Sequence, residues 1–106
     1  MRILGIDPGT ATVGWGVIEI TSGQVSLVAY GHISTSKDLP LSKRLLEIAT
    51  DLKSIIDLHQ PEESSVEELF FFKNQKTVLS VGQARGAILL TLEEKGVIIV
   101  GYTPLQ

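Results

Sequence analysis

The stretch ILGIDPGT, residues 3–10, decides the fold, because a short apolar segment ends there in an Asp-Pro-Gly turn. Residues 3–7 are predicted to form a buried strand that finishes at Asp7. Residues 13–20 are rich in β-branched side chains, and a Ser-Gly pair then turns the chain into a third such run at residues 24–35. The first third of the chain is therefore predicted to be a β-meander.

Beyond the meander the hydrophobic period changes. Apolar residues recur at spacings of three and four over residues 41–59, which predicts an amphipathic helix. Residues 64–69 are predicted to be a brief strand, residues 75–95 a second helix that Gly96 ends, and residues 97–102 a final strand. The order β-β-β-α-β-α-β predicts an α/β fold with a five-stranded mixed sheet, in which both helices cross over between parallel strands.

Composition sets limits on the class of protein. The 106 residues suffice for one domain, and no apolar run approaches the ~18 residues that a membrane span needs. The chain has no cysteine, which excludes disulfides and thiolate metal sites and fits a cytoplasmic location. A net charge of −3 argues weakly against a nucleic-acid binder. However, residues 69–92 carry three basic side chains and no acid, and such a local basic stretch can bind a polyanion.

Two acidic residues are candidate metal ligands. Asp7 ends the first predicted strand, where carboxylates of open α/β sheets face the ligand crevice, although capping of the turn is the alternative. Alternation in the fourth strand sends Glu67 and Glu68 to opposite faces. If that strand lies parallel beside the first, Asp7 and Glu67 can jointly ligate a hard divalent cation of the kind used in phosphoryl transfer; the alternative is a solvated acidic loop. His32 and His59 are isolated and lack metal-ligand spacing.

Aromatic and glycine residues supply two further features. Residues 70–72 are three phenylalanines directly before Lys73, a combination that suits stacking on unpaired bases or, for part of the triplet, packing in a core. Gly82 and Gly86 lie four apart inside the second predicted helix, where each glycine costs up to about 1 kcal/mol relative to alanine. Their spacing allows another backbone to approach closely, either in this chain's own sheet or in a second subunit.

Three segments together resemble the RuvC family of bacterial Holliday-junction resolvases. They are residues 3–17 with ILGIDPGT and GWGV, residues 66–74 with VEELF and KN, and residues 82–86 with GQARG, in the family's order and spacing. The opening motif alone is also similar to actin-like ATPases and to other ribonuclease H-like proteins, whereas the three segments together indicate this family. The resemblance covers essentially the whole chain and about the first two thirds of the family's domain.

The resemblance implies a ribonuclease H-like fold and a homodimer that resolves four-way DNA junctions by paired symmetric nicks with Mg²⁺ or Mn²⁺. It implies that Asp7 and Glu67 are catalytic metal ligands, that Phe70 contacts the junction, and that Gly82 and Gly86 lie in the helix through which subunits pair. The junction-binding and branch-migration proteins RuvA and RuvB are the implied partners. Basic residues expected to hold DNA phosphates are Lys73, Lys76 and Arg85.

The chain stops at Gln106, before the C-terminal helix on which the family carries two further aspartates, so we expect residues 1–106 to be a single truncated domain with that helix missing. Two carboxylates are expected to hold one ion weakly. Three alternatives stay open: a catalytically incomplete fragment that dimerises or binds DNA, a related nuclease that acts on ribosomal RNA, and half of an actin-like ATPase.

Overall fold

In the part of the chain that the structure describes, five strands and two helices follow one another in the order that the sequence predicts. The computed structural model describes residues 1–9, 11–68 and 75–101, with the backbone alone for residues 75–78. Within the described residues, neither helix is long and apolar enough to cross a membrane. The elements are β1 (Arg2–Pro8), β2 (Thr12–Thr21), β3 (Gln24–Ser34), α1 (Leu41–His59), β4 (Glu63–Val66), α2 (Gln75–Glu94) and β5 (Ile98–Ile99).

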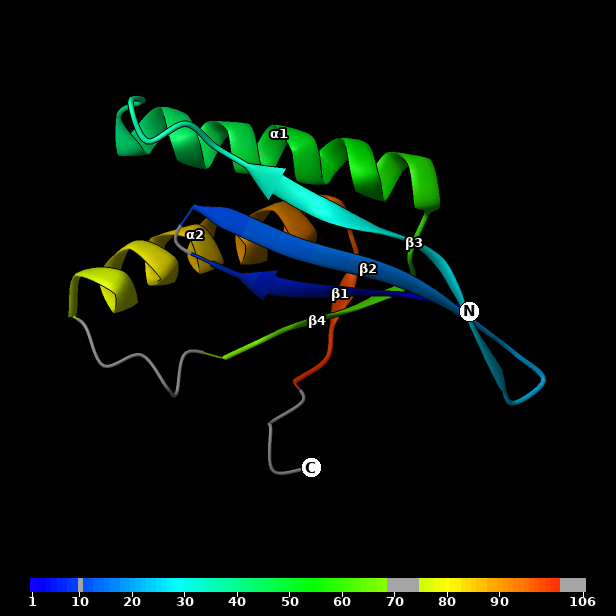
Figure 1. The fold of residues 1–106 in the computed structure, drawn as a ribbon. Helices are drawn as coiled ribbons and strands as arrows, with labels where there is room; N and C mark the ends of the chain where they lie inside the picture. Colours follow the sequence, from blue (N-terminus) through cyan, green and yellow to red (C-terminus); the bar gives the residue numbers. More distant parts are fainter. Residues whose placement is uncertain (10, 69–74, 102–106) are drawn as a thin grey trace.

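The strands form one mixed sheet in the order β3-β2-β1-β4-β5 (Figure 1). β1, β2 and β3 are antiparallel neighbours, as a meander requires. β4 returns to pair parallel with β1, and β5 pairs parallel with β4, so both helices are crossovers between strands of the same direction. The predicted five-stranded mixed sheet is confirmed, and the fourth strand lies parallel beside the first, which is the condition on which the metal-site hypothesis depended.

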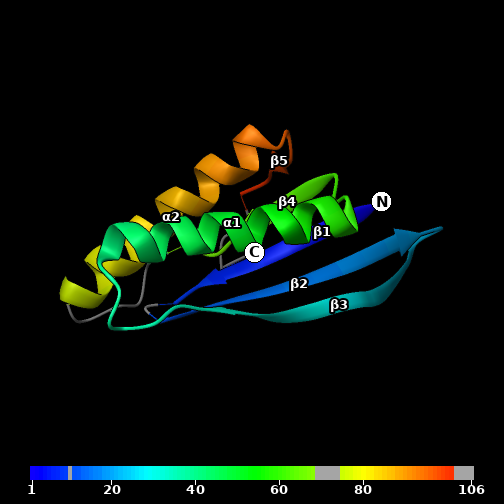
Figure 2. The ribbon, with the colours of Figure 1, turned by 90° about the horizontal axis from the view of Figure 1, so that it is seen from above.

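Both helices pack on the same side of the sheet (Figure 2), and the core lies between these two layers. Alternation along each strand sends every second side chain toward the helices. Burying an aliphatic side chain of this kind stabilises the fold by roughly 1.5–3 kcal/mol. The buried aliphatic residues include Leu4 and Ile6 of β1, Val13 and Val17 of β2, Ile48, Leu52 and Ile56 of α1, and Ile88 and Leu92 of α2.

The other face of the sheet is covered by no helix or strand among the described residues (Figure 2). Near its centre, Gly5 of β1 pairs with Gly16 of β2, and Asp7 pairs with Gly14 two residues further along. Asp7 lies between Ile6 and Pro8, which are both buried, so alternation along β1 points Asp7 away from the core, and its side chain is exposed. This open face therefore carries the first candidate metal ligand.

The ends of three elements have local causes. α2 stops where Gly96 adopts a left-handed φ of 71°, and the Gly96 N–H donates to the Glu93 carbonyl oxygen at 3.1 Å, so the predicted stop is confirmed. β4 ends at Val66, which corrects the predicted strand at 64–69. The next hydrogen bond that β1 would donate to β4 is from Pro8, which has no amide hydrogen, so the ladder between the two strands is not continued there. β5 is likewise shorter than the predicted strand at 97–102, since its ladder with β4 spans only two residue pairs.

Candidate functional site

The parallel pairing of β1 and β4 brings Asp7 and Glu67 together. Ile6 lies opposite Val66 at the end of the ladder, and the Glu67 N–H donates to the Ile6 carbonyl oxygen at 3.0 Å. Asp7 and Glu67 each follow one of these two paired residues, so they lie side by side just beyond the end of the ladder, with their carboxyl groups close enough for a protonated Glu67 to donate to Asp7. Both side chains are exposed, at the edge of the sheet where the carboxyl ends of β1 and β4 meet.

The contact between the two carboxyl groups changes the acidity of Glu67. Asp7 raises the pKa of Glu67 above its ordinary value of 4.5, first because a protonated Glu67 donates a hydrogen bond to Asp7, then because the two negative charges repel each other, and last through partial burial. When both carboxylates are ionised they therefore repel each other, and a bound cation would relieve this repulsion.

The oxygen donors of the pair suit a hard divalent cation such as Mg²⁺ or Mn²⁺, which takes about six oxygen ligands and accepts water for several of them. The part of the chain that the structure describes contains no group of three or more histidine or acidic side chains that could hold a metal ion. The described residues thus supply two carboxylates, Asp7 and Glu67, and leave the remaining coordination positions to water or to a substrate oxygen.

Two glycines, Gly9 and Gly14, lie near Asp7. A Cβ atom at Gly9 would collide with the carbonyl oxygen of Thr12, so the close approach of Gly9 to Thr12 requires glycine at position 9. On the next strand Gly14 leaves the space beside Asp7 without a side chain. A Cβ atom there would lie 3.8 Å from the Asp7 Cβ and 3.8 Å from the His32 Cδ2, which are ordinary contact distances.

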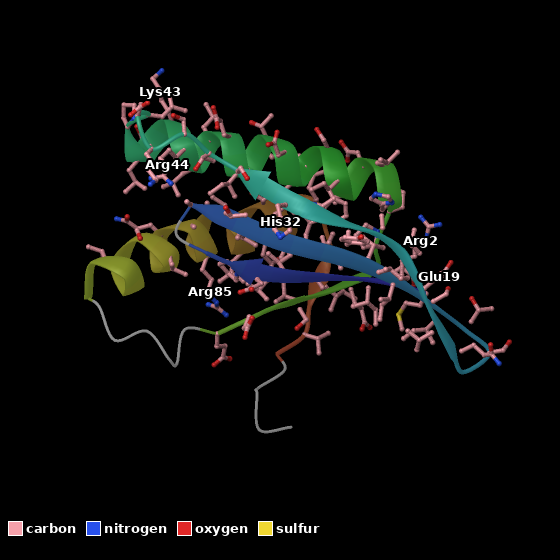
Figure 3. All side chains as sticks on the ribbon, in the orientation of Figure 1. Arg2, Glu19, His32, Lys43, Arg44 and Arg85 are labelled. Carbon is pink, nitrogen blue, oxygen red and sulfur yellow. The ribbon has the colours of Figure 1, made fainter. Side chains whose placement is uncertain are left out.

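His32 of β3 is a residue near the site that the sequence did not indicate. The pairs Asp7–Gly14 and Gly14–His32 place the three residues in one row across β1, β2 and β3, on the open face. Figure 3 shows the imidazole in front of β2, and its side chain is exposed. Only the register of the strands shows this proximity, because His32 has no ligand-like spacing to either acid in the sequence.

Arg85 reaches the site from α2. Its Nε donates a hydrogen bond to the main-chain carbonyl oxygen of Glu67 at 3.2 Å, and Figure 3 shows the side chain between α2 and the end of β4. Of the four expected DNA contacts, Arg85 is the one whose side chain is described. Phe70 and Lys73 lie outside the described residues, as does the side chain of Lys76.

Gly86 lies on the face of α2 that points away from the sheet. It is exposed, and a Cβ atom there would have no neighbour within 4 Å. Leu79 and Leu90, seven residues before and four after it on the same face, are 65% and 62% exposed. Packing on this chain's own sheet therefore does not explain Gly86, whereas Gly82 is half-buried.

Comparison with known proteins gives a family match over nearly the whole chain. The family model described as crossover junction endodeoxyribonuclease RuvC matches residues 3–106. A protein of that name from Caldicellulosiruptor saccharolyticus is 50% identical over 107 residues, which cover 100% of this chain and 64% of the relative. A second one, from Petrotoga mobilis, is 50% identical over 106 residues and is covered to 65%. The chain thus spans about two thirds of the length of these curated relatives.

Solved structures agree with the fold. Thermus thermophilus RuvC, determined in complex with a Holliday junction substrate, superimposes with a TM-score of 0.88 at 31% identity, over 98% of this chain and 64% of that one. The Fowlpox virus resolvase shares the fold alone, with a TM-score of 0.67 at 15% identity. The expected ribonuclease H-like fold is confirmed. Since the family model accounts for all but the first two residues, the chain belongs to the RuvC family of crossover junction endodeoxyribonucleases.

Proposed function

We propose that this protein is a metal-dependent endonuclease that resolves four-way DNA junctions by nicking two opposed strands, with Asp7 and Glu67 as metal ligands. The observation that carries the proposal is the exposed carboxylate pair at the neighbouring carboxyl ends of β1 and β4. A solved relative of 31% identity, Thermus thermophilus RuvC, was captured with a Holliday junction substrate, and this supports the choice of substrate.

The residues of this chain hold two exposed carboxylates where a phosphodiester can approach them. The β1–β4 ladder holds the two carboxylates side by side, and their exposure lets a DNA backbone approach. Without a cation the pair repels phosphate, which explains why cleavage would require a divalent ion. A bound Mg²⁺ or Mn²⁺ would supply Lewis acidity and a more acidic water as the nucleophile.

We also propose that the protein acts as a homodimer whose subunits pair through the outward face of α2. Leu79, Gly86 and Leu90 leave an apolar surface there, with a glycine that lets a second backbone come close. Two opposed nicks require two active sites, which a pair of subunits provides. Phe70, Lys73 and Lys76 remain the candidate DNA contacts. The sequence predicts Arg85 as a fourth, but its Nε is on the Glu67 carbonyl oxygen. The partners RuvA and RuvB and a cytoplasmic location are proposed from family membership alone.

The test is a nicking assay on a synthetic four-way junction with labelled strands, with Mg²⁺ or Mn²⁺. The wild-type protein should produce paired nicks at symmetric positions, and Asp7→Asn should reduce nicking to background. Asp51→Asn on the exposed surface of α1 is the matched control and should leave the rate unchanged. Nicking by Asp7→Asn at the wild-type rate would refute the metal role of Asp7.

Junction binding without cleavage is the second candidate function. It is favoured by the small number of described ligands, since two carboxylates are few for a rigid two-ion site. A junction-binding titration and sedimentation analysis of the same protein separate the two functions. Dimerisation and binding with no nicking in either metal would support the second one.

A further inference from the structure

The hydrogen-bond ladder between β1 and β4 is interrupted at Pro8. Among the described residues, Glu67 is the last of the ladder to donate, with its N–H on the Ile6 carbonyl oxygen at 3.0 Å. In a regular parallel ladder the Glu67 carbonyl oxygen would then accept from the residue two positions beyond Ile6. That residue is Pro8, which has no amide hydrogen. The Glu67 carbonyl oxygen is therefore an acceptor for which β1 offers no donor.

Arg85 supplies the donor that Pro8 lacks. Its Nε lies 3.2 Å from the Glu67 carbonyl oxygen. Val81, Ala84 and Ile88 of α2 are buried and face the sheet. Arg85 lies one helical turn after Val81 and one before Ile88, and it is half-buried. The stem of Arg85 therefore leaves α2 on its packed side, so the helix sets the direction in which the guanidinium points (Figure 3).

The two hydrogen bonds act on both sides of the Glu67 Cα atom. The peptide group before it is held through its N–H by Ile6, and the peptide group after it is held through its carbonyl by Arg85. Peptide groups are planar, so fixing both of them fixes φ and ψ of the residue between them. The direction of the Cα–Cβ bond then follows, and this direction places the Glu67 carboxyl group beside Asp7.

We propose that Arg85 is a positioning residue for Glu67: it replaces the ladder bond that Pro8 cannot donate and so holds the Glu67 carboxylate in the pair with Asp7. The inference rests on the proposed function only in treating this pair as the metal site. The opposite face of α2 carries Gly86, so the helix that bears the proposed subunit contact also holds the acidic pair. Residues that orient metal ligands typically contribute 10- to 100-fold to metal affinity.

The experiment measures Mn²⁺ binding by calorimetry without DNA, and junction affinity over a salt series without divalent metal. Arg85→Met keeps most of the length of the side chain but removes the donor. It should weaken Mn²⁺ binding about 10- to 100-fold, while the junction Kd changes less than about twofold and keeps its salt dependence. Arg85→Lys, which keeps a donor on a flexible stem, should lie between Arg85→Met and the wild type.

A phosphate-binding role for Arg85 predicts the opposite result. Mn²⁺ binding would then be unchanged, while the junction Kd would rise and the slope of log Kd against log salt would fall by about one. That outcome overturns the positioning role. Circular dichroism of each variant checks that the fold is retained.

The double variant Pro8→Ala with Arg85→Met tests the missing ladder bond itself. Alanine restores an amide hydrogen at position 8, so the double variant should bind Mn²⁺ more tightly than Arg85→Met alone. If Mn²⁺ binding does not recover, the ladder explanation is overturned.

The two proposals fail separately: a wild type that nicks junctions while Arg85→Met binds Mn²⁺ normally refutes only the role of Arg85. A wild type that nicks nothing, while Arg85→Met still weakens Mn²⁺ binding, refutes only the nuclease.

Discussion

Replacing Glu67 by glutamine is expected to stabilise the metal-free protein at neutral pH. Asp7 raises the pKa of Glu67 above its ordinary 4.5, so the folded protein binds a proton at this site more tightly than the unfolded chain does. The contribution of Glu67 to stability is therefore most favourable below pH 4.5 and is lost as the pH rises through the raised value. Glutamine removes the charge and keeps a donor for the Asp7 carboxylate.

The size of this effect follows from the exposure of both side chains. Solvent screens an exposed charge pair, for which measured interactions amount to about 0.2–1 kcal/mol. The hydrogen bond from the glutamine amide to Asp7 adds to the gain from removing the repulsion, so the effect should lie in the upper part of this range. We therefore expect Glu67→Gln to raise the free energy of unfolding at pH 7 by about 0.5–1 kcal/mol. In a domain of this size that corresponds to an increase in Tm of about 2–8 °C.

Thermal unfolding in a metal chelator, at pH 7 and near pH 4, measures the difference. The gain of Glu67→Gln should be present at pH 7 and absent near pH 4, where Glu67 is largely protonated. Glu68→Gln is the matched control, because it makes the same chemical change one residue away from the pair and should show no such pH dependence. A lower Tm for Glu67→Gln at pH 7, or an equal gain at both pH values, would refute the reasoning.

Divalent metal should reverse this order of stability. A ligand that binds only the folded protein stabilises it by RT ln(1 + [L]/Kd), which is about 1.4 kcal/mol when the free metal is ten times the Kd. The wild type should gain this amount from Mg²⁺ or Mn²⁺, and Glu67→Gln should gain less. Equal gains in both proteins would show that Glu67 is not a ligand.

Three further substitutions have expected outcomes. Gly31→Ala should destabilise the protein by about 1–3 kcal/mol in denaturant unfolding, because the new Cβ would lie 3.0 Å from the Trp15 Cζ2 within a packed layer; an unchanged midpoint would contradict this. Gly86→Leu should leave the subunit folded, since a Cβ there has no neighbour within 4 Å, but should abolish dimerisation in sedimentation; a dimer of wild-type strength would exclude this surface. Gln60→Gly, at a left-handed φ of 53° after α1, should raise the free energy of unfolding by up to about 1 kcal/mol, and a decrease would show that the Gln60 side chain contributes more than its backbone strain costs.

The sequence by itself determined the order and kind of the elements. Hydrophobic periodicity and turn residues act over a few neighbouring positions, so the meander, both helices and the stop at Gly96 could be predicted without tertiary information. The parallel direction of the fourth strand also followed, because a helix crossover joins strands that run the same way. Its place beside the first strand was a condition of the metal-site hypothesis and was settled by the structure. The same reasoning overestimated the length of β4, since it did not use the missing amide hydrogen of Pro8 on a different strand.

Only the tertiary structure decided which side chains meet. Asp7 and Glu67 are sixty residues apart, and their contact depends on the register in which Ile6 lies opposite Val66. The charge of Arg85 suggested a phosphate, yet its Nε is on the Glu67 carbonyl oxygen, because the rotation of α2 on the sheet sets its direction. Register and helix rotation are settled by the packing of the whole core, to which residues from every part of the chain contribute, and no local pattern contains them.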